Sequence, residues 1–239
     1  MILTHDEHEP RIHPTSYVAP NAVVCGNVTM GAGCRVMFGA CVIAEGKPVT
    51  IGENCIVMEN AVLRSTDKHE LTIGRGCLIG PHAHVVGCTV EDEVFIATGA
   101  SVFHGARLGT KAEVRVHAVV HLRTELPAEA VVPIGWVAVG KPAVLLPPEK
   151  HEEIWAVQKP LDFPGFVYGF SRESGEEIID AMKKITQTRS EELGRHRDDR
   201  VTLADQDRHQ PPPDDSRGSC DQNFRHGNLR LFCMQEAIR

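Results

Sequence analysis

The chain has 239 residues, which leaves room for one domain and an appendage. Its formal net charge is -7 and no stretch forms a basic stripe, so the electrostatic footprint of a nucleic-acid-binding protein is absent. The most apolar stretch, residues 128–147, is interrupted by Glu129, Lys141 and several prolines, which argues against a membrane span.

Residues 1–11 precede the periodic part of the chain and are expected to form an N-terminal arm. They lack a charged start followed by an apolar core, so no signal peptide is expected. The open end of a repetitive β-structure exposes unpaired backbone groups. The arm is therefore expected to supply a lead-in strand that covers the first repeat.

Residues 12–147 follow a period of six. Blocks such as IGRGCL and IGPHAH, which start at Ile73 and Ile79, open with an aliphatic residue and carry a small residue four places later. A period of six fits neither a helix nor a simple strand, but it fits a short strand plus a turn. If three blocks close one triangular coil, about twenty blocks give a mainly β fold, a parallel β-helix of about seven coils.

The chain contains eight cysteines and no CxxC pair. Cys34, Cys55 and Cys77 occupy the small inward position of their blocks, where a thiol behaves as a compact apolar group. Reduced structural thiols and a cytoplasmic location are therefore expected, without a metal cluster.

Two insertions interrupt the period. The block after Val42 reads VIAEGKPVT and the block after Leu63 reads LRSTDKHELT, three and four residues too long. Counted in threes, both insertions fall at the same corner of the coil. Loops on one corner of a rigid scaffold are frequent sites of function, and the second loop carries His69.

After the coils the composition changes. Residues 148–196 contain an aromatic arm, HEEIWAVQKPLDFPGFVYGF, expected to be a short helix and an extended segment lying on its own or a neighbouring solenoid. Residues 174–195 fit a helix with Ile178, Ile179, Met182 and Ile185 on one side. Residues 197–239 are charged, contain prolines and few apolar anchors, and are expected to be disordered.

The hexad array, the loop after Leu63, the motif VGKPA and the helix after it resemble the γ-class carbonic anhydrase family within the wider hexapeptide-repeat transferases. The resemblance covers Ile12 to about Ala143. It implies that the parallel β-helix is left-handed, and that the protein is a homotrimer with zinc held between two subunits by three histidines. A metal-bound hydroxide attacks carbon dioxide in such enzymes.

The ligand histidines implied by the resemblance are replaced. Family members typically read NIQDGxVxH where this chain has IVMENAVLR, so Arg64 stands at a ligand position. The family's IGHxAxxHGC corresponds to IGPHAHVVGC, which puts Pro81 and Val86 at the other two. A guanidinium cannot bind a cation, and proline and valine side chains offer no lone pair. The usual zinc site is expected to be empty and hydratase activity is not expected.

The rest of the family site differs as well. The residues Ile43, Ala44 and Glu45 correspond to the family's RGD segment, and Met58 corresponds to a glutamine that would bond the hydroxide. Only Glu59 is chemically similar to its counterpart in the family, which is an aspartate. We therefore predict a candidate cleft from Arg64, Glu45, Glu59, His69 and His82, either as a charge-paired subunit contact or as a site where Arg64 receives a small anion.

Three functional hypotheses remain open. The first is a homotrimeric binding or scaffold protein whose aromatic arm contacts its own trimer or a protein partner. The second is an acyltransferase that binds acetyl-CoA in a trimer groove and uses His69 as the base. The third is a carbonic anhydrase whose metal site has moved to other histidines: His82, His104, His117 and His121. The first hypothesis is favoured, with no metal and no assigned catalytic residue.

Overall fold

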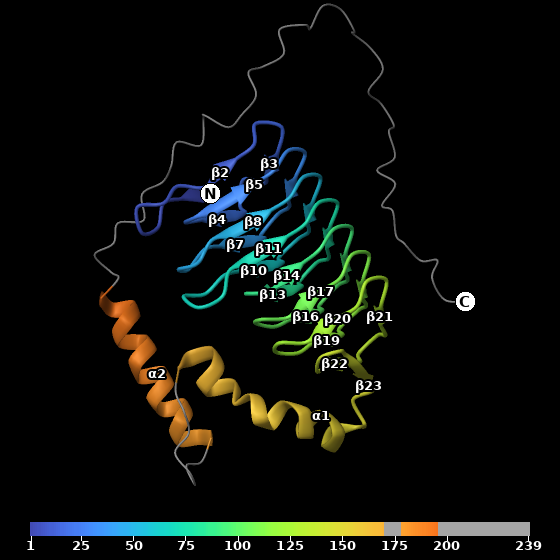
Figure 1. Ribbon diagram of the computed structural model, residues 1–239. Coiled ribbons are helices and arrows are strands. Elements are labelled where there is room, and N and C mark those ends of the chain that lie inside the picture. The colour runs from blue at the N-terminus through green and yellow to red at the C-terminus, as the bar shows by residue number, and fades with distance from the viewer. Residues whose placement is uncertain (170–177, 196–239) are drawn as a thin grey trace, which may run out of the picture. The chain divides into compact units, whose positions relative to one another are not determined.

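The computed structural model describes residues 1–169 and 178–195. Its main part is a β-solenoid of three parallel sheets, stacked coil on coil (Figure 1). Sheet I contains nine strands: β1 (Ile2–Leu3), β4 (Val23–Cys25), β7 (Cys41–Ile43), β10 (Val62–Arg64), β13 (His84–Val86), β16 (Ser101–Val102), β19 (Val119–Val120), β22 (Val137–Val139) and β23 (Val144–Leu146).

Sheets II and III contain seven strands each. Sheet II consists of β2 (Arg11–Ile12), β5 (Val28–Met30), β8 (Val49–Ile51), β11 (Leu71–Ile73), β14 (Thr89–Val90), β17 (Arg107–Leu108) and β20 (Glu125–Leu126). Sheet III consists of β3 (Tyr17–Val18), β6 (Arg35–Val36), β9 (Ile56–Val57), β12 (Leu78–Ile79), β15 (Phe95–Ile96), β18 (Glu113–Val114) and β21 (Val131–Val132). Each coil runs through sheets II, III and I in that order.

The six-residue register predicted from the sequence is confirmed by the strand pairing. Leu63 pairs with Val42 on the previous coil and with Val85 on the next, and all three side chains are buried. A fully buried aliphatic side chain contributes about 1.5–3 kcal/mol. Each sheet therefore contributes one column of inward-facing aliphatic side chains. The burial of these columns stabilises the solenoid.

Both ends of sheet I carry a strand outside the regular repeat. β1 pairs in parallel with β4, as expected of a lead-in strand that covers the first coil. At the other end β23 folds back antiparallel on β22. Each strand satisfies backbone groups that an open solenoid end would expose to solvent or to another chain.

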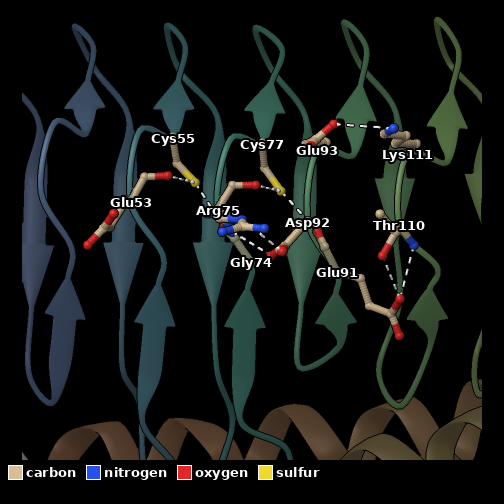
Figure 2. A network of polar contacts seen from close by, with 10 residues as sticks. All are labelled: Glu53, Cys55, Gly74, Arg75, Cys77, Glu91, Asp92, Glu93, Thr110 and Lys111. Carbon is tan, nitrogen blue, oxygen red and sulfur yellow. Dashed lines mark hydrogen bonds and ion pairs between the residues drawn. The ribbon is translucent and has the colours of Figure 1, made fainter.

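The corner between sheets II and III combines buried thiols with surface ion pairs (Figure 2). Cys55 Sγ donates to the carbonyl oxygen of Gly74 at 3.0 Å, and Cys77 Sγ donates to that of Glu91 at 3.1 Å. Outside them, Arg75 pairs with Asp92 on the next coil at 3.1 Å. The buried, compact role predicted for Cys34, Cys55 and Cys77 is confirmed, since each is at most 1% exposed. All six cysteines of the described residues are free thiols.

The segment after the coils is helical. It contains α1 (His151–Gln158), the 3₁₀-helix η1 (Lys159–Leu161), the π-helical turn η2 (Pro164–Tyr168) and, after a gap, α2 (Ile178–Arg195). The extended arm expected after the short helix is therefore a helical turn. In α2, Ile185 is buried, with 4% of its surface exposed. Met182, which was predicted to lie on the same side of the helix, is 44% exposed. Residues 170–177 and the predicted disordered tail, 197–239, lie outside the described residues.

No helix among the described residues has the length and apolar character needed to span a membrane.

Candidate functional site

The two insertions leave the solenoid together at the corner between sheets I and II, as the spacing predicted. The amide of Lys47 donates to the carbonyl of Thr66 at 3.0 Å, and the amide of Glu45 donates to Ser65 Oγ at 3.2 Å. Ser65 is fully buried and donates its own hydroxyl to the carbonyl of Lys47. The two loops are therefore joined by hydrogen bonds. We call this part of the molecule, between sheets I and II, the I–II corner.

Arg64 forms an ion pair with Glu45 at this corner. Arg64 Nε donates to Glu45 Oε2 at 2.8 Å, and Nη2 contacts the same oxygen. The two side chains are 39% and 26% exposed. A partly exposed pair of this kind contributes about 0–1 kcal/mol, so its main effect is to fix the direction of the guanidinium.

His69 and His104 meet at the same corner. Their ring centroids are 5.9 Å apart and the rings meet edge to face. Gly87, which lies between them, has φ of +51°, and a Cβ at this position would stand 2.7 Å from the Cβ of His69 and 3.4 Å from Cδ2 of His104. Only glycine allows both imidazoles to approach the backbone so closely.

The aromatic arm packs on His69. Phe166 of η2 lies 4.9 Å from the ring of His69, and the guanidinium of Arg123 lies 5.5 Å from the centroid of the same Phe166 ring. The arm therefore packs on its own solenoid, and its Phe166 ring contacts both an imidazole and a cation.

A second aromatic contact anchors the arm at Phe103, on the coil that carries His104. Phe103 lies 5.8 Å from His121 and 6.1 Å from Phe163, which in turn lies 6.1 Å from Tyr168. Arg64, Val86, Phe103 and His121 follow one another at the equivalent place of successive coils.

The histidines of the corner are held in their neutral form. Burial lowers the pKa of His104 to about 4, with further contributions from His69, Arg64 and His84. Burial also lowers the pKa of His121 to about 4. The pKa of His69 is lowered by burial, then by the charges of Lys68 and Arg123.

His104 is buried and one of its ring nitrogens has no hydrogen-bond partner. Its side chain is 7% exposed, and its Nδ1 is buried without a hydrogen-bond partner. The Nδ1 of His121 is buried without a partner as well. An unsatisfied buried polar atom costs about 1–3 kcal/mol, so each such atom needs an explanation.

Two members of the predicted cleft lie elsewhere. Glu59 and His82 belong to the corner between sheets III and I, at the opposite end of strands β10 and β13 from Arg64. The amide of His82 donates to the carbonyl of Glu59 at 3.0 Å. Within one chain, the structure therefore groups Glu45, Arg64 and His69 and separates them from Glu59 and His82.

The four histidines considered for a relocated metal site are also divided between two corners. His82 and His117 occupy turn positions with φ of +57° and +54° between sheets III and I, whereas His104 and His121 follow strands of sheet I. Across the described residues, no group of three or more histidine, cysteine, aspartate or glutamate side chains has an arrangement that could hold a metal ion.

The residues at positions 64, 81 and 86 do not fit a zinc ion. Arg64 and Val86 pair in register on adjacent coils, and Pro81 lies at the corner between sheets III and I. The guanidinium of Arg64 is occupied by Glu45, and Val86 is 5% exposed. None of the three side chains offers a lone pair to a cation. Their correspondence with the ligands of the resembled family stays a prediction.

Sequence reasoning missed the pairing of His69 with His104. The loop that carries His69 is out of register, so counting in sixes does not place it. The glycine at position 87, one coil before His104, is the sequence signal for this pairing. Gly87 takes a left-handed conformation and lies beside both rings.

Comparisons with known proteins agree with the repeat pattern. The chain is 31% identical over 151 residues to γ carbonic anhydrase 1, mitochondrial, of Arabidopsis thaliana, covering 61% of this chain and 53% of that protein. It is 30% identical over 139 residues to the carboxysome assembly protein CcmM of Synechocystis, covering 53% of this chain and 20% of that protein.

The chain thus spans about half the length of the first of these relatives and a smaller part of the second. A solved hexapeptide transferase family protein of Anaplasma phagocytophilum aligns with 79% of this chain and 97% of its own, at 21% identity and a TM-score of 0.42. No protein-family model matches the chain.

Proposed function

Because the chain is a γ-carbonic-anhydrase-like hexapeptide-repeat protein, we propose that it is a homotrimeric binding or assembly protein that does not hydrate carbon dioxide. The observation that carries the proposal is the Arg64–Glu45 ion pair, with Val86 buried beside it on the next coil. A protonated guanidinium repels a divalent cation, and a buried valine leaves no room for metal-bound water.

The outer surfaces of the solenoid support the trimer. The outward column of sheet III carries four exposed apolar residues, Tyr17, Ile56, Phe95 and Val131, together with the charged residues Arg35 and Glu113. Ile134 next to this column is 65% exposed. The outward column of sheet II is instead rich in threonine: Thr29, Thr50, Thr72 and Thr89. The exposed apolar side chains of sheet III favour a buried subunit contact there, with the threonine face in water.

A function in assembly is further supported by the relative in Synechocystis, whose name describes carboxysome assembly. The chain covers 20% of that protein, so the support concerns the use of the solenoid as a building unit.

The proposal is tested by the metal content of the full chain, purified without chelator from cells grown with added zinc. We expect a zinc-to-protein ratio far below one, since the three positions supply no ligand atom. A ratio near one ion for each chain would contradict the proposal. The His104→Gln and His82→Gln variants would then show which corner holds the ion.

A further inference from the structure

The I–II corner concentrates positive charge around two neutral imidazoles. The charges that lower the pKa of His69 are Lys68 and Arg123, and Arg64 is among the groups that lower the pKa of His104. Arg64 is paired with Glu45, whereas the guanidinium of Arg123 faces the Phe166 ring. No carboxylate is among the groups that shift the pKa of either imidazole.

The Phe166 ring contacts both an imidazole and a cation of the corner. Its centroid lies 4.9 Å from that of the His69 ring and 5.5 Å from Cζ of Arg123. The tip of the ring also reaches the solenoid backbone, since a Cβ on Gly105 would stand 3.6 Å from its Cζ. The face of an aromatic ring carries partial negative charge, so the ring is a weak substitute for an anion.

The buried Nδ1 of His104 is a second observation at this corner, and it lies on the ring edge opposite the Cδ2 atom that faces Gly87. The side chain is more than nine-tenths buried and this atom makes no hydrogen bond. If His104 were protonated, Nδ1 would become a donor and would need an acceptor beside it. A small oxyanion supplies acceptors, and its charge stabilises the protonated ring.

We propose that the I–II corner binds a small oxyanion between His69, His104 and Arg123, in competition with the ring of Phe166. Binding takes up a proton, because the anion stabilises the imidazolium form of a histidine that is neutral in the free protein. The aromatic arm is then the cover of the site, and the ligand releases Phe166 from the solenoid. This inference names the ligand class of the proposed binding protein and lies within a single chain.

Other titratable groups act on the two imidazoles from neighbouring strands and from the loop of His69. His84 and Arg64 act on His104 from strands β13 and β10, and Lys68 acts on His69 from its own loop. On the arm, Tyr168 packs against Phe163, and Asp162 accepts a hydrogen bond at its backbone carbonyl from Phe166. These contacts leave Arg123 as the cation that faces the Phe166 ring directly.

The test is isothermal titration calorimetry of the full chain at pH 6.5, with sodium acetate and sodium sulfate as probes and sodium chloride at equal ionic strength as the blank. Acetate does not titrate at this pH, so a comparison of bis-Tris and imidazole buffers, which differ in ionisation enthalpy, measures the protons taken up. We expect saturable binding with proton uptake. The acetate and sulfate arms distinguish a planar carboxylate from a tetrahedral oxyanion.

Variants make the test specific. Arg123→Gln is expected to weaken binding about tenfold or more, since a charge-assisted hydrogen bond contributes about 1.5–3 kcal/mol. Arg107→Gln, on the exposed face of sheet II, is the matched control and should leave binding unchanged. Phe166→Ala is expected to tighten binding about two- to fivefold, because the competing contact between ring and cation is lost.

The inference is overturned if neither the native chain nor Phe166→Ala binds either probe above the chloride blank. Binding without proton uptake, or an equal response of Arg123→Gln and Arg107→Gln, would overturn it as well. Failure of this test leaves the zinc content and the oligomeric state untouched, so it can be told apart from failure of the proposed function. His104→Gln gives a further check, since it should bind without proton uptake by that ring.

Discussion

Replacing Phe95 and Ile134 together with glutamate is expected to convert a trimer into monomers. Phe95 is 37% exposed on the outer face of sheet III, and Ile134 is 65% exposed at the neighbouring corner. In a trimer built on this face, each subunit would bury both new carboxylates, and an unpaired buried charge costs several kcal/mol. The mass measured by light scattering should fall from three times 26.2 kDa to a single 26.2 kDa chain.

The matched control places the same charges on the threonine face. Thr50→Glu with Thr72→Glu adds two carboxylates to the outward column of sheet II, which the proposed trimer leaves in water. This variant should keep the trimer mass, while the two like charges on paired strands lower the thermal unfolding midpoint slightly. A native chain that is already a monomer, or a trimer that is lost only in the threonine variant, would contradict the assignment of sheet III to the interface.

Acidification is expected to destabilise the protein between pH 6.5 and about 4 through His104 and His121. Both imidazoles have a folded-state pKa of about 4, below the ordinary value of 6.5, because burial disfavours the charged ring. The stability that follows from the neutral rings is complete above pH 6.5 and is lost as the pH falls towards 4. The loss is on the order of 1–3 kcal/mol for each ring.

Urea unfolding at pH 7.5, 5.5 and 4.5 measures this effect. The double variant His104→Leu with His121→Leu should flatten the pH dependence, because leucine has no proton to gain. His13→Gln, an exposed histidine of the first coil, should leave the slope unchanged. If the leucine variant loses stability with pH as steeply as the native chain, other groups control the acid transition.

The solenoid could be predicted from the sequence because its signal is repeated in every coil. Each inward position is filled by an aliphatic residue and each corner by a small one, so an error at one block would be corrected by its neighbours. The same register holds outside the core, where Arg64, Val86, Phe103 and His121 form one column on successive coils. The shared corner of the two loops followed from the same counting.

The site could be predicted only in part, because its residues come from segments that break the register. His69 lies in an insertion and Phe166 lies in the arm, and neither position follows from a period of six. Glu59 and His82 were grouped with Arg64 although the III–I corner separates them along the strand. The position of a residue within its block predicts the face of the solenoid on which its side chain lies. The residues that contact this side chain depend on how the loops and the arm fold.

The conformation of the arm differs from the expected extended segment. Pro164 and Gly165 begin a π-helical turn that presents Phe166 to the corner. Proline at the start of a helix costs nothing in hydrogen bonds, because the first amides of a helix have no partner within it. The aromatic residues then fix the turn by packing on imidazole rings.

The central claim is that arginine, proline and valine at positions 64, 81 and 86 exclude a catalytic zinc ion. Stopped-flow measurement of carbon dioxide hydration, with the full chain saturated with zinc, tests this claim most directly. The account predicts a rate equal to that of the buffer with zinc alone. A chain-dependent acceleration that disappears on chelation of the metal would contradict it.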